Sequence, residues 1–91
     1  MQRVRTSLPR PQVLAAARDF FAVRSGIYSA FLEKEGPGYI TLRGQGGEEI
    51  VIGAVDAPGG TDVTGSSYLF DAQVARFLST LPPSAVGEAA V

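Results

Sequence analysis

The side chains that could do chemistry in this chain are carboxylates and arginines, because its 91 residues contain no histidine and no cysteine. Histidine is the usual proton shuttle near neutral pH, and both residue types are leading metal ligands and nucleophiles. Four carboxylates lie near expected turns: Glu48, Glu49, Asp56 and Asp62. They could bind a metal or act as acid and base, but they lack a ligand spacing such as D-x-D-x-D-G. We therefore expect no catalytic residue, no metal site and no cofactor, and a carboxylate-dependent enzyme ranks third among the functions considered.

Two glycine-rich segments could in principle hold a phosphate group. Residues 44–47 (GQGG) lead into two carboxylates instead of a helix, and residues 56–65 (DAPGGTDVTG) contain no lysine and no Walker pattern. We interpret the first segment as a hairpin turn and the second as a connecting loop.

Basic residues are concentrated near the N-terminus. Residues 1–24 carry five arginines and one aspartate, whereas residues 25–91 carry three basic and eight acidic residues. Because arginine donates two parallel hydrogen bonds to a phosphate, such an arm could bind nucleic acid with salt-sensitive affinity. It could equally lie on its own acidic body, and a sequence pI of about 5.2 is low for a nucleic-acid-binding domain. The arm residues would be Arg3, Arg5, Arg10, Arg18 and Arg24.

The elements that would position these residues follow from apolar spacing and turn signals. Residues 1–10 are predicted to be an extended basic arm, because Pro9 and Pro11 disfavour helix before them. Apolar residues at helical spacing predict helices over 11–24 and 72–81. The prolines at 82 and 83 end the second helix, and residues 84–91 are expected to be a frayed tail.

Strands are predicted between the two helices. Runs rich in β-formers lie at 27–34, 39–43 and 49–55 and are separated by glycine-rich turns, and residues 66–70 could add a short fourth strand. The predicted fold is therefore α+β, with one domain over 11–83. It is a two-layer domain in which an antiparallel meander of three or four strands carries the N-terminal and C-terminal helices on one face, in the order α-β-β-β-(β)-α.

Both faces of the predicted sheet look apolar, although the helices can cover only one. A monomer seldom leaves a large apolar patch in water, so we expect a second copy or another protein to cover the other face. The alternative is that the arm, the 56–65 loop or the tail folds over it. The interface residues would be Tyr28, Leu32, Val51 and Val55, and a one-residue shift in register would exchange the faces. Tyr39 and Arg43 share one side of their strand and could stack bases, but the flanking basic residues such a platform needs are sparse.

No stretch approaches the roughly 18–20 apolar residues that span a bilayer. The N-terminal arginines are not followed by the apolar region of a signal peptide, so we expect a cytoplasmic protein with no membrane partner. The preference for arginine over lysine, with abundant alanine, glycine and valine, is a bacterial-like composition that reflects genomic bias. The sequence favours a small non-enzymatic interaction or regulatory module that self-associates through its sheet as a homodimer. The alternative is a nucleic-acid-associated protein that uses the arginine arm.

Overall fold

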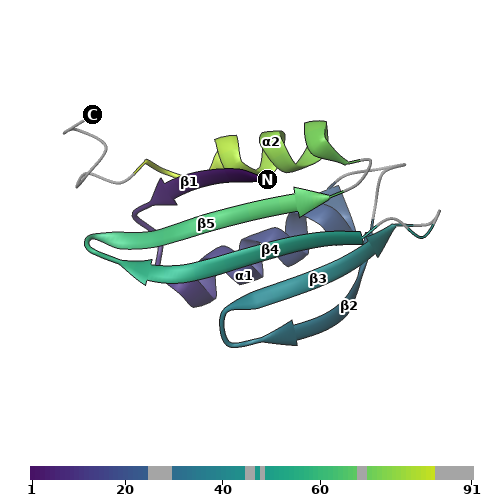
Figure 1. The fold of residues 1–91 in the computed structure, drawn as a ribbon, viewed down its shortest axis with the longest axis horizontal. Helices are drawn as coiled ribbons and strands as arrows, with labels where there is room; N and C mark the ends of the chain where they lie inside the picture. The colour runs from purple at the N-terminus through teal and green to yellow at the C-terminus, as the bar shows by residue number, and fades with distance from the viewer. Residues whose placement is uncertain (25–29, 45–46, 48, 68–69, 84–91) are drawn as a thin grey trace.

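Two helices pack on one face of a five-stranded antiparallel sheet in the computed structural model of the chain (Figure 1). The structure describes residues 1–24, 30–44, 47, 49–67 and 70–83. Within these residues the elements are β1 (Gln2–Thr6), α1 (Arg10–Asp19), the π-helical turn η1 (Phe20–Arg24), β2 (Ala30–Gly36), β3 (Tyr39–Gly44), β4 (Glu49–Ala57), β5 (Gly60–Ser67) and α2 (Asp71–Thr80). The predicted α+β class and the antiparallel meander are confirmed, and the sheet gains a strand that precedes the first helix.

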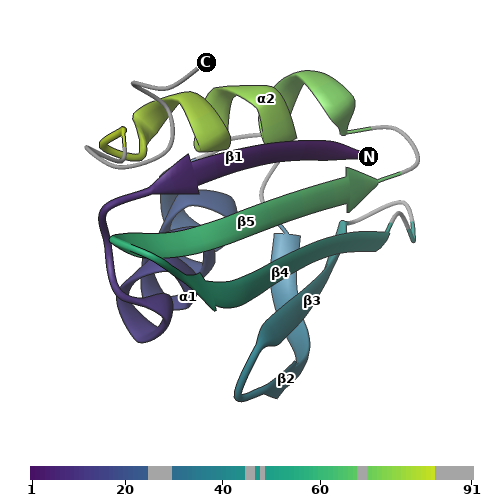
Figure 2. The ribbon, with the colours of Figure 1, turned by 60° about the vertical axis from the view of Figure 1, so that its left-hand side comes forward.

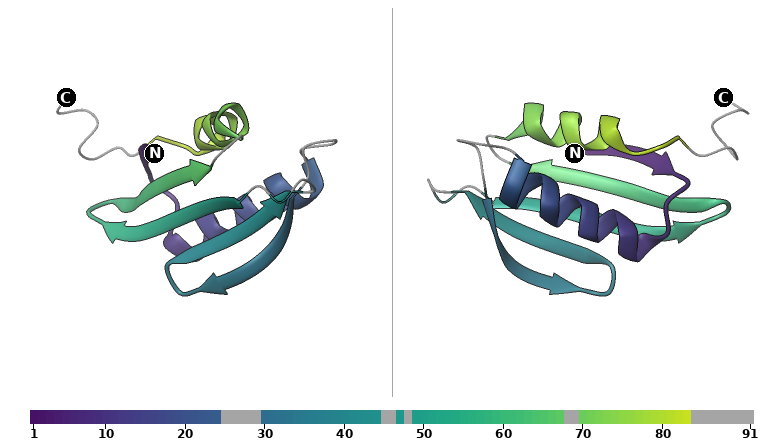
Figure 3. Two further views of the ribbon diagram at one scale, coloured as in Figure 1. Left: turned by 45° about the vertical axis from the view of Figure 1, so that its right-hand side comes forward. Right: turned by 180° about the vertical axis from the view of Figure 1, so that it is seen from behind.

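The strand order is β1-β5-β4-β3-β2, and every neighbouring pair is antiparallel. Strands β2 to β5 form consecutive hairpins, whereas β1 lies at the sheet edge beside β5 (Figure 2). Seen from behind, α1 crosses the sheet obliquely and α2 runs near β1 and β5 (Figure 3). The chain therefore crosses from one edge of the sheet to the other between β1 and β2.

The core lies between the sheet and the helices. Alternate residues of β3, β4 and β5 face the helices and are at most 1 % exposed: Ile40, Leu42, Ile50, Ile52, Ala54 and Val63. On α2, Val74 and Phe77 are fully buried against them. This period-two burial in the strands and the apolar stripe on the helix are the patterns that the sequence showed.

The first helix is shorter than predicted. Pro11 lies in its first turn, where the missing N–H costs no hydrogen bond, and Val13 and Ala17 are buried one turn apart. After Asp19 the chain continues as η1, in which Phe20 and Phe21 both lie against Phe77, with ring centroids 5.6 Å from it in each case. Neither helix in the described part of the chain is long and apolar enough to cross a membrane.

The prediction of a loop over 56–65 is wrong. Strand β4 continues to Ala57, and a tight turn at Pro58 and Gly59 leads directly into β5. Gly59 has a φ of 78°, a conformation that other residues rarely adopt. The predicted fourth strand over 66–70 consequently lies too late in the chain, because β5 already begins at Gly60.

The predicted arm is largely a strand of the sheet. Residues Gln2–Thr6 pair with residues 61–65 of β5. Thr6 is fully buried, and its Oγ1 donates a 2.6 Å hydrogen bond to the carbonyl oxygen of Pro82, just after α2. A Cβ on Gly60 would overlap the carbonyl oxygen of Thr6, so the backbone of β1 lies directly against this glycine. The first strand is thus fixed by β5 on one side and by the segment after α2 on the other.

Candidate functional site

The sheet face opposite the helices, here called the helix-free face, carries outward side chains from all five strands. They are Arg3 and Arg5 on β1, Lys34 on β2, Tyr39, Thr41 and Arg43 on β3, Glu49, Val51, Gly53 and Val55 on β4, and Asp62, Thr64 and Ser66 on β5. Among the described residues, the exposed large apolar side chains are Met1, Tyr39 and Val55, and the last is 66 % exposed. Tyr39 pairs directly with Gly53, so Val55 is its diagonal neighbour on the same face.

Small side chains keep the middle of this face low. A Cβ on Gly53 would come within 2.8 Å of Thr64 Oγ1, so the hydroxyl of β5 closes over the glycine of β4. Beside them, Val51 pairs with Thr41 on one side and Ser66 on the other. The face is therefore more polar than the sequence suggested, because β5, which was predicted as a loop, contributes hydroxyls and a charge in addition to the polar side chains of β3.

An ion pair ties β1 to β5 at one corner of the helix-free face. Arg5 and Asp62 are cross-strand partners, and Nε and Nη2 of Arg5 donate to the two carboxylate oxygens of Asp62 at 2.6 and 3.1 Å. This hydrogen bonding lowers the pKa of Asp62 below its ordinary 3.8, and the charges of Arg5 and Arg3 add to the effect. The corner therefore holds fixed positive and negative charge side by side.

A second ion pair lies at the opposite end of the face. Arg43 donates to both oxygens of Glu33 at 2.7 and 2.9 Å, and its Nη2 is 3.6 Å from Oε2 of Glu49. A register shift between Leu32 and Lys34 brings Glu33 to this position. The hydrogen bond from Arg43 lowers the pKa of Glu33, and the same contact raises the pKa of Arg43.

The four residues predicted to form the interface do not share one face in the structure. Val51 and Val55 lie on the helix-free face, as predicted. Leu32 is paired with Leu42 and packs against the core, so it lies on the helix side. Tyr28 lies outside the described residues. Tyr39 was considered only as a possible base-stacking residue. The alternation along its strand was the signal that it lies on the sheet face opposite Ile40 and Leu42, and Val55 shares that face.

The arginines of the predicted arm are divided between the two sides of the sheet. Arg3 and Arg5 belong to the helix-free face, whereas Arg10 and Arg18 lie on α1; the side chain of Arg24 is not described. Three of them have acidic neighbours within the body of the protein. These pairs are Arg5 with Asp62 at 2.6 Å, Arg18 with Glu35 at 2.7 Å and Arg10 with Asp56 at 3.7 Å. The four arginines whose side chains are described therefore do not form one continuous strip, and three of them are balanced by carboxylates of the chain itself.

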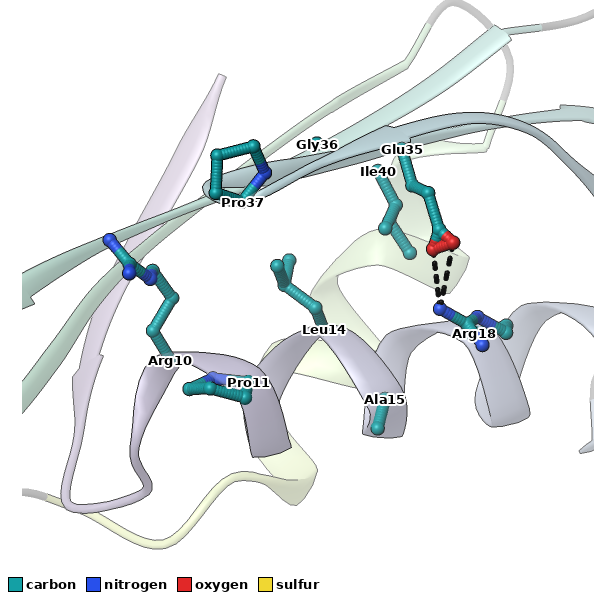
Figure 4. A pocket seen from close by; sticks show the side chains of 9 residues that line it. All are labelled: Arg10, Pro11, Leu14, Ala15, Arg18, Glu35, Gly36, Pro37 and Ile40. Carbon is teal, nitrogen blue, oxygen red and sulfur yellow. Dashed lines mark hydrogen bonds and ion pairs between the residues drawn. The ribbon is translucent and has the colours of Figure 1, made fainter.

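Arg10 and Arg18 instead line a groove of about 350 Å³ between α1 and the β2–β3 hairpin (Figure 4). Its other lining residues are Pro11, Leu14, Ala15, Glu35, Gly36, Pro37 and Ile40. Leu14 and Ile40 are almost fully buried; Leu14 lies between the two arginines, and Ile40 lies nearer Glu35. The groove combines an apolar centre with a guanidinium group toward each end, an arrangement the sequence did not predict.

The edges of the sheet are poor sites for adding a strand. Along β1, Pro82 and Pro83 pair with Thr6 and Ser7, and the Gln2 side chain donates to the Asp71 carbonyl oxygen. The β2 edge is interrupted by the register shift at Leu32 and carries charged residues in succession from 33 to 35. Bulges, prolines and charges are the usual means by which proteins prevent edge-to-edge pairing.

No protein-family model, curated protein or solved structure matches the chain. Within the described ranges, no group of three or more histidine, cysteine, aspartate or glutamate residues is placed to hold a metal ion. The helix-free face and the groove are therefore the two surfaces from which function can be argued.

Proposed function

We propose that the protein is a non-enzymatic association module whose helix-free face binds a second copy of the chain. The observation that carries this proposal is the position of Tyr39 and Val55, two exposed apolar side chains at diagonal positions on a face whose middle carries small residues. Val51 lies two residues before Gly53 on β4 and is half-buried. It extends the same apolar strip along this strand.

Shape and charge support a second copy as the occupant. The low centre around Gly53 and Thr64 allows another flat sheet to approach closely. A two-fold interface must be complementary to itself, and this face carries both signs of charge at opposite ends, in Arg5 with Asp62 and in Arg43 with Glu33. The protected edges favour face-to-face contact over extension of the sheet.

The size of the face sets the expected strength. Five strands about 4.8 Å apart and about six residues long at 3.3 Å per residue give a flat footprint of about 24 by 20 Å. Permanent dimers generally bury larger and more apolar surfaces. We therefore expect a reversible dimer whose population depends on protein concentration.

The test is sedimentation equilibrium over a wide range of protein concentration, with two variants. Val55→Glu places a charge in the apolar strip, and because Val55 is 66 % exposed the variant should keep its fold, which circular dichroism verifies. Ala75→Glu adds the same charge to an exposed position of α2 and serves as the matched control. We expect wild type and Ala75→Glu to dimerise alike and Val55→Glu to remain monomeric. A wild type that stays monomeric at millimolar concentration, or a folded Val55→Glu that dimerises normally, would refute the proposal.

The nucleic-acid alternative receives less support from these residues. Phosphate binding requires arginines that can exchange their present partners. Arg5 makes a bidentate contact with Asp62, and Nη2 of Arg18 donates to both oxygens of Glu35. Dimerisation would nevertheless bring two copies of Arg3 together, so binding to nucleic acid at low salt is a useful secondary measurement.

A further inference from the structure

The groove between α1 and the β2–β3 hairpin has the size and lining of a small-molecule site. Its volume of about 350 Å³ lies within the usual range for such sites. The groove opens beside α1, on the helix side of the sheet, and is therefore separate from the helix-free face (Figure 4).

The middle of the groove suits a hydrocarbon group. Leu14 from the helix lies there, Ile40 from β3 lies toward the Arg18 end, and Pro11 and Pro37 lie toward the Arg10 end (Figure 4). Between the two arginines, the lining side chains offer no hydrogen-bonding group. A sugar or a nucleotide base would lose hydrogen bonds to water in such a place without replacement, whereas an apolar group would gain by leaving water.

The two arginines at the ends of the groove differ in how completely their guanidinium groups are hydrogen-bonded within the protein. Nη2 of Arg18 donates to both carboxylate oxygens of Glu35 at 2.7 and 3.2 Å, so this guanidinium is neutralised in place. Within the described part of the chain, the acidic neighbour of Arg10 is Asp56, and Nη1 lies 3.7 Å from Oδ2, which is too long for a hydrogen bond. Nε of Arg10 is buried and has no hydrogen-bond partner among the described residues. Arg10 is therefore the cation in the groove that an incoming anion would stabilise most.

The start of α1 adds to the positive potential at this end. The helix begins at Arg10, its N-cap residue Pro9 makes no side-chain cap, and its first turn contains no acidic residue. Among the described residues, no side-chain cap and no acidic residue of the first turn offsets the partial positive charge of this helix N-terminus.

We propose that this groove binds a compact amphipathic monocarboxylate. Its carboxylate lies against Arg10 at the start of α1, and its hydrocarbon body lies over Leu14 and Ile40 toward the Arg18–Glu35 pair. A small rotation of the Arg10 side chain brings its unpartnered Nε to the carboxylate and removes the cost of burying that N–H alone. Eight residues at 1.5 Å each separate Arg10 from Arg18, about 12 Å along the helix, which accommodates an acid of about eight carbons.

Titration of ¹⁵N-labelled protein with octanoate, followed by amide chemical shifts, tests the site. Two related compounds separate the contributions: 1-octanol has the same body without the charge, and acetate has the charge without the body. We expect octanoate to shift the amides of Ala15 and Gly36 selectively and to bind at least tenfold more tightly than either compound, as a charge-assisted hydrogen bond predicts.

Three variants identify the residues responsible. Arg10→Gln should weaken octanoate binding about tenfold or more while leaving 1-octanol binding unchanged. Ala15→Phe, at an exposed helical position lining the groove, should fill it and abolish binding of both compounds. Arg76→Gln removes one positive charge from the exposed surface of α2 and should change nothing. The proposal is overturned if the groove amides do not respond to millimolar octanoate, if 1-octanol binds as tightly as octanoate, or if Arg10→Gln binds octanoate like wild type. Because none of these variants alters the helix-free face, the outcome is independent of dimerisation.

Discussion

Replacing Gly65 by alanine should destabilise the protein, although alanine ordinarily favours a strand over glycine. Gly65 lies on β5 and faces α2. A Cβ at this position would be 2.6 Å from Cγ1 of Val74 and 3.4 Å from Cδ1 of Ile52. Both neighbours are fully buried, so the new methyl group has no solvent toward which it can displace them.

The magnitude follows from this geometry. Carbon atoms in contact are about 3.5–4.0 Å apart, so the methyl group lacks about 1 Å of space. Val74 is β-branched and strongly prefers one rotamer in a helix, so either it adopts a strained rotamer or α2 moves away from the sheet. Overpacking of this kind costs about 1–3 kcal/mol. The reduced entropy of the unfolded chain offsets up to about 1 kcal/mol. We expect the free energy of unfolding to fall by about 1–2 kcal/mol, which at this chain length lowers Tm by about 4–16 °C.

The assay is urea unfolding followed by far-ultraviolet circular dichroism, applied to a double-mutant cycle. Val74→Ala alone leaves a cavity and should cost about 2 kcal/mol, from two buried methyl groups and the cavity that remains. In the double variant the methyl group added at position 65 occupies part of that cavity. Gly65→Ala together with Val74→Ala should therefore be no less stable than Val74→Ala alone, which corresponds to a coupling energy of at least about 1 kcal/mol.

Additivity of the two substitutions would refute this reasoning, because it would mean that the two positions do not compete for the same space. A Gly65→Ala protein as stable as wild type would refute it as well, since α2 would then stand farther from β5 than the structure places it. Gly53→Ala is not a suitable control, because that position also has a close neighbour, Thr64 Oγ1 at 2.8 Å. Ala75→Gly on the exposed side of α2 reports the effect of a helix substitution without any change at the sheet.

Two further predictions concern the first strand. Gly60→Ala should displace the end of β1, because the new Cβ would overlap the backbone of Thr6. Hydrogen exchange of the β1 amides should then accelerate while the amides of β3 and β4 remain protected. If the β1 amides of the variant are as protected as those of wild type, the placement of this strand is contradicted. The second prediction concerns Asp62, whose pKa is lowered by its ion pair with Arg5. The ionised carboxylate stabilises the fold at pH values above its ordinary pKa of 3.8, and this stabilisation is lost as the pH falls through the pKa of Asp62 in the folded protein. The stability difference between wild type and Asp62→Asn should therefore be small at neutral pH, smaller in high salt, and lost as the pH falls below the pKa of Asp62 in the folded protein. A difference that persists unchanged on acidification would exclude this ion pair as its source.

Local signals in the sequence sufficed for the parts of the fold that depend on neighbouring residues. Pro11 and the spacing of Val13 and Ala17 predicted the first helix, and the stripe containing Val74 and Phe77 predicted the second. The turn around Pro37 and the alternation after it predicted the β2–β3 hairpin. In each case the buried residues are strongly apolar and are separated by one helical turn or by two strand positions.

The elements that were missed owe their positions to distant partners. Strand β5 reads as a loop because, of its buried residues, only Val63 is strongly apolar. Thr61 is buried because its Oγ1 donates to the Leu8 carbonyl oxygen at 2.7 Å, and Gly65 is buried because α2 leaves no room for a side chain. Neither reason is visible without the tertiary structure. Strand β1 was missed in the same way, since its partner begins more than fifty residues later in the chain.

The candidate sites were predicted less completely than the fold. Val51 and Val55 were predicted to share one face of the sheet, and they do. Leu32 was predicted to share it too, but β2 has a register shift after Leu32, so simple alternation does not tell which face each residue of that strand occupies. Arg10 and Arg18 were interpreted as one basic strip with Arg3 and Arg5. Their separation depends on the turn between β1 and α1, which places the two pairs on opposite sides of the sheet.

The pairing of β1 with β5 also bears on the order in which the protein assembles. Arg5 and Asp62 are 57 residues apart, whereas each hairpin from β2 to β5 joins neighbouring segments. Closing the longer loop costs more entropy, so the hairpins can form before β1 docks. During translation at about 5–20 residues per second, β1 waits about 3–12 s after its own synthesis before β5 has been made. The residues of β1 are synthesised before those of the other described strands but are among the last to become fixed, and α1 has no completed sheet to cover until then.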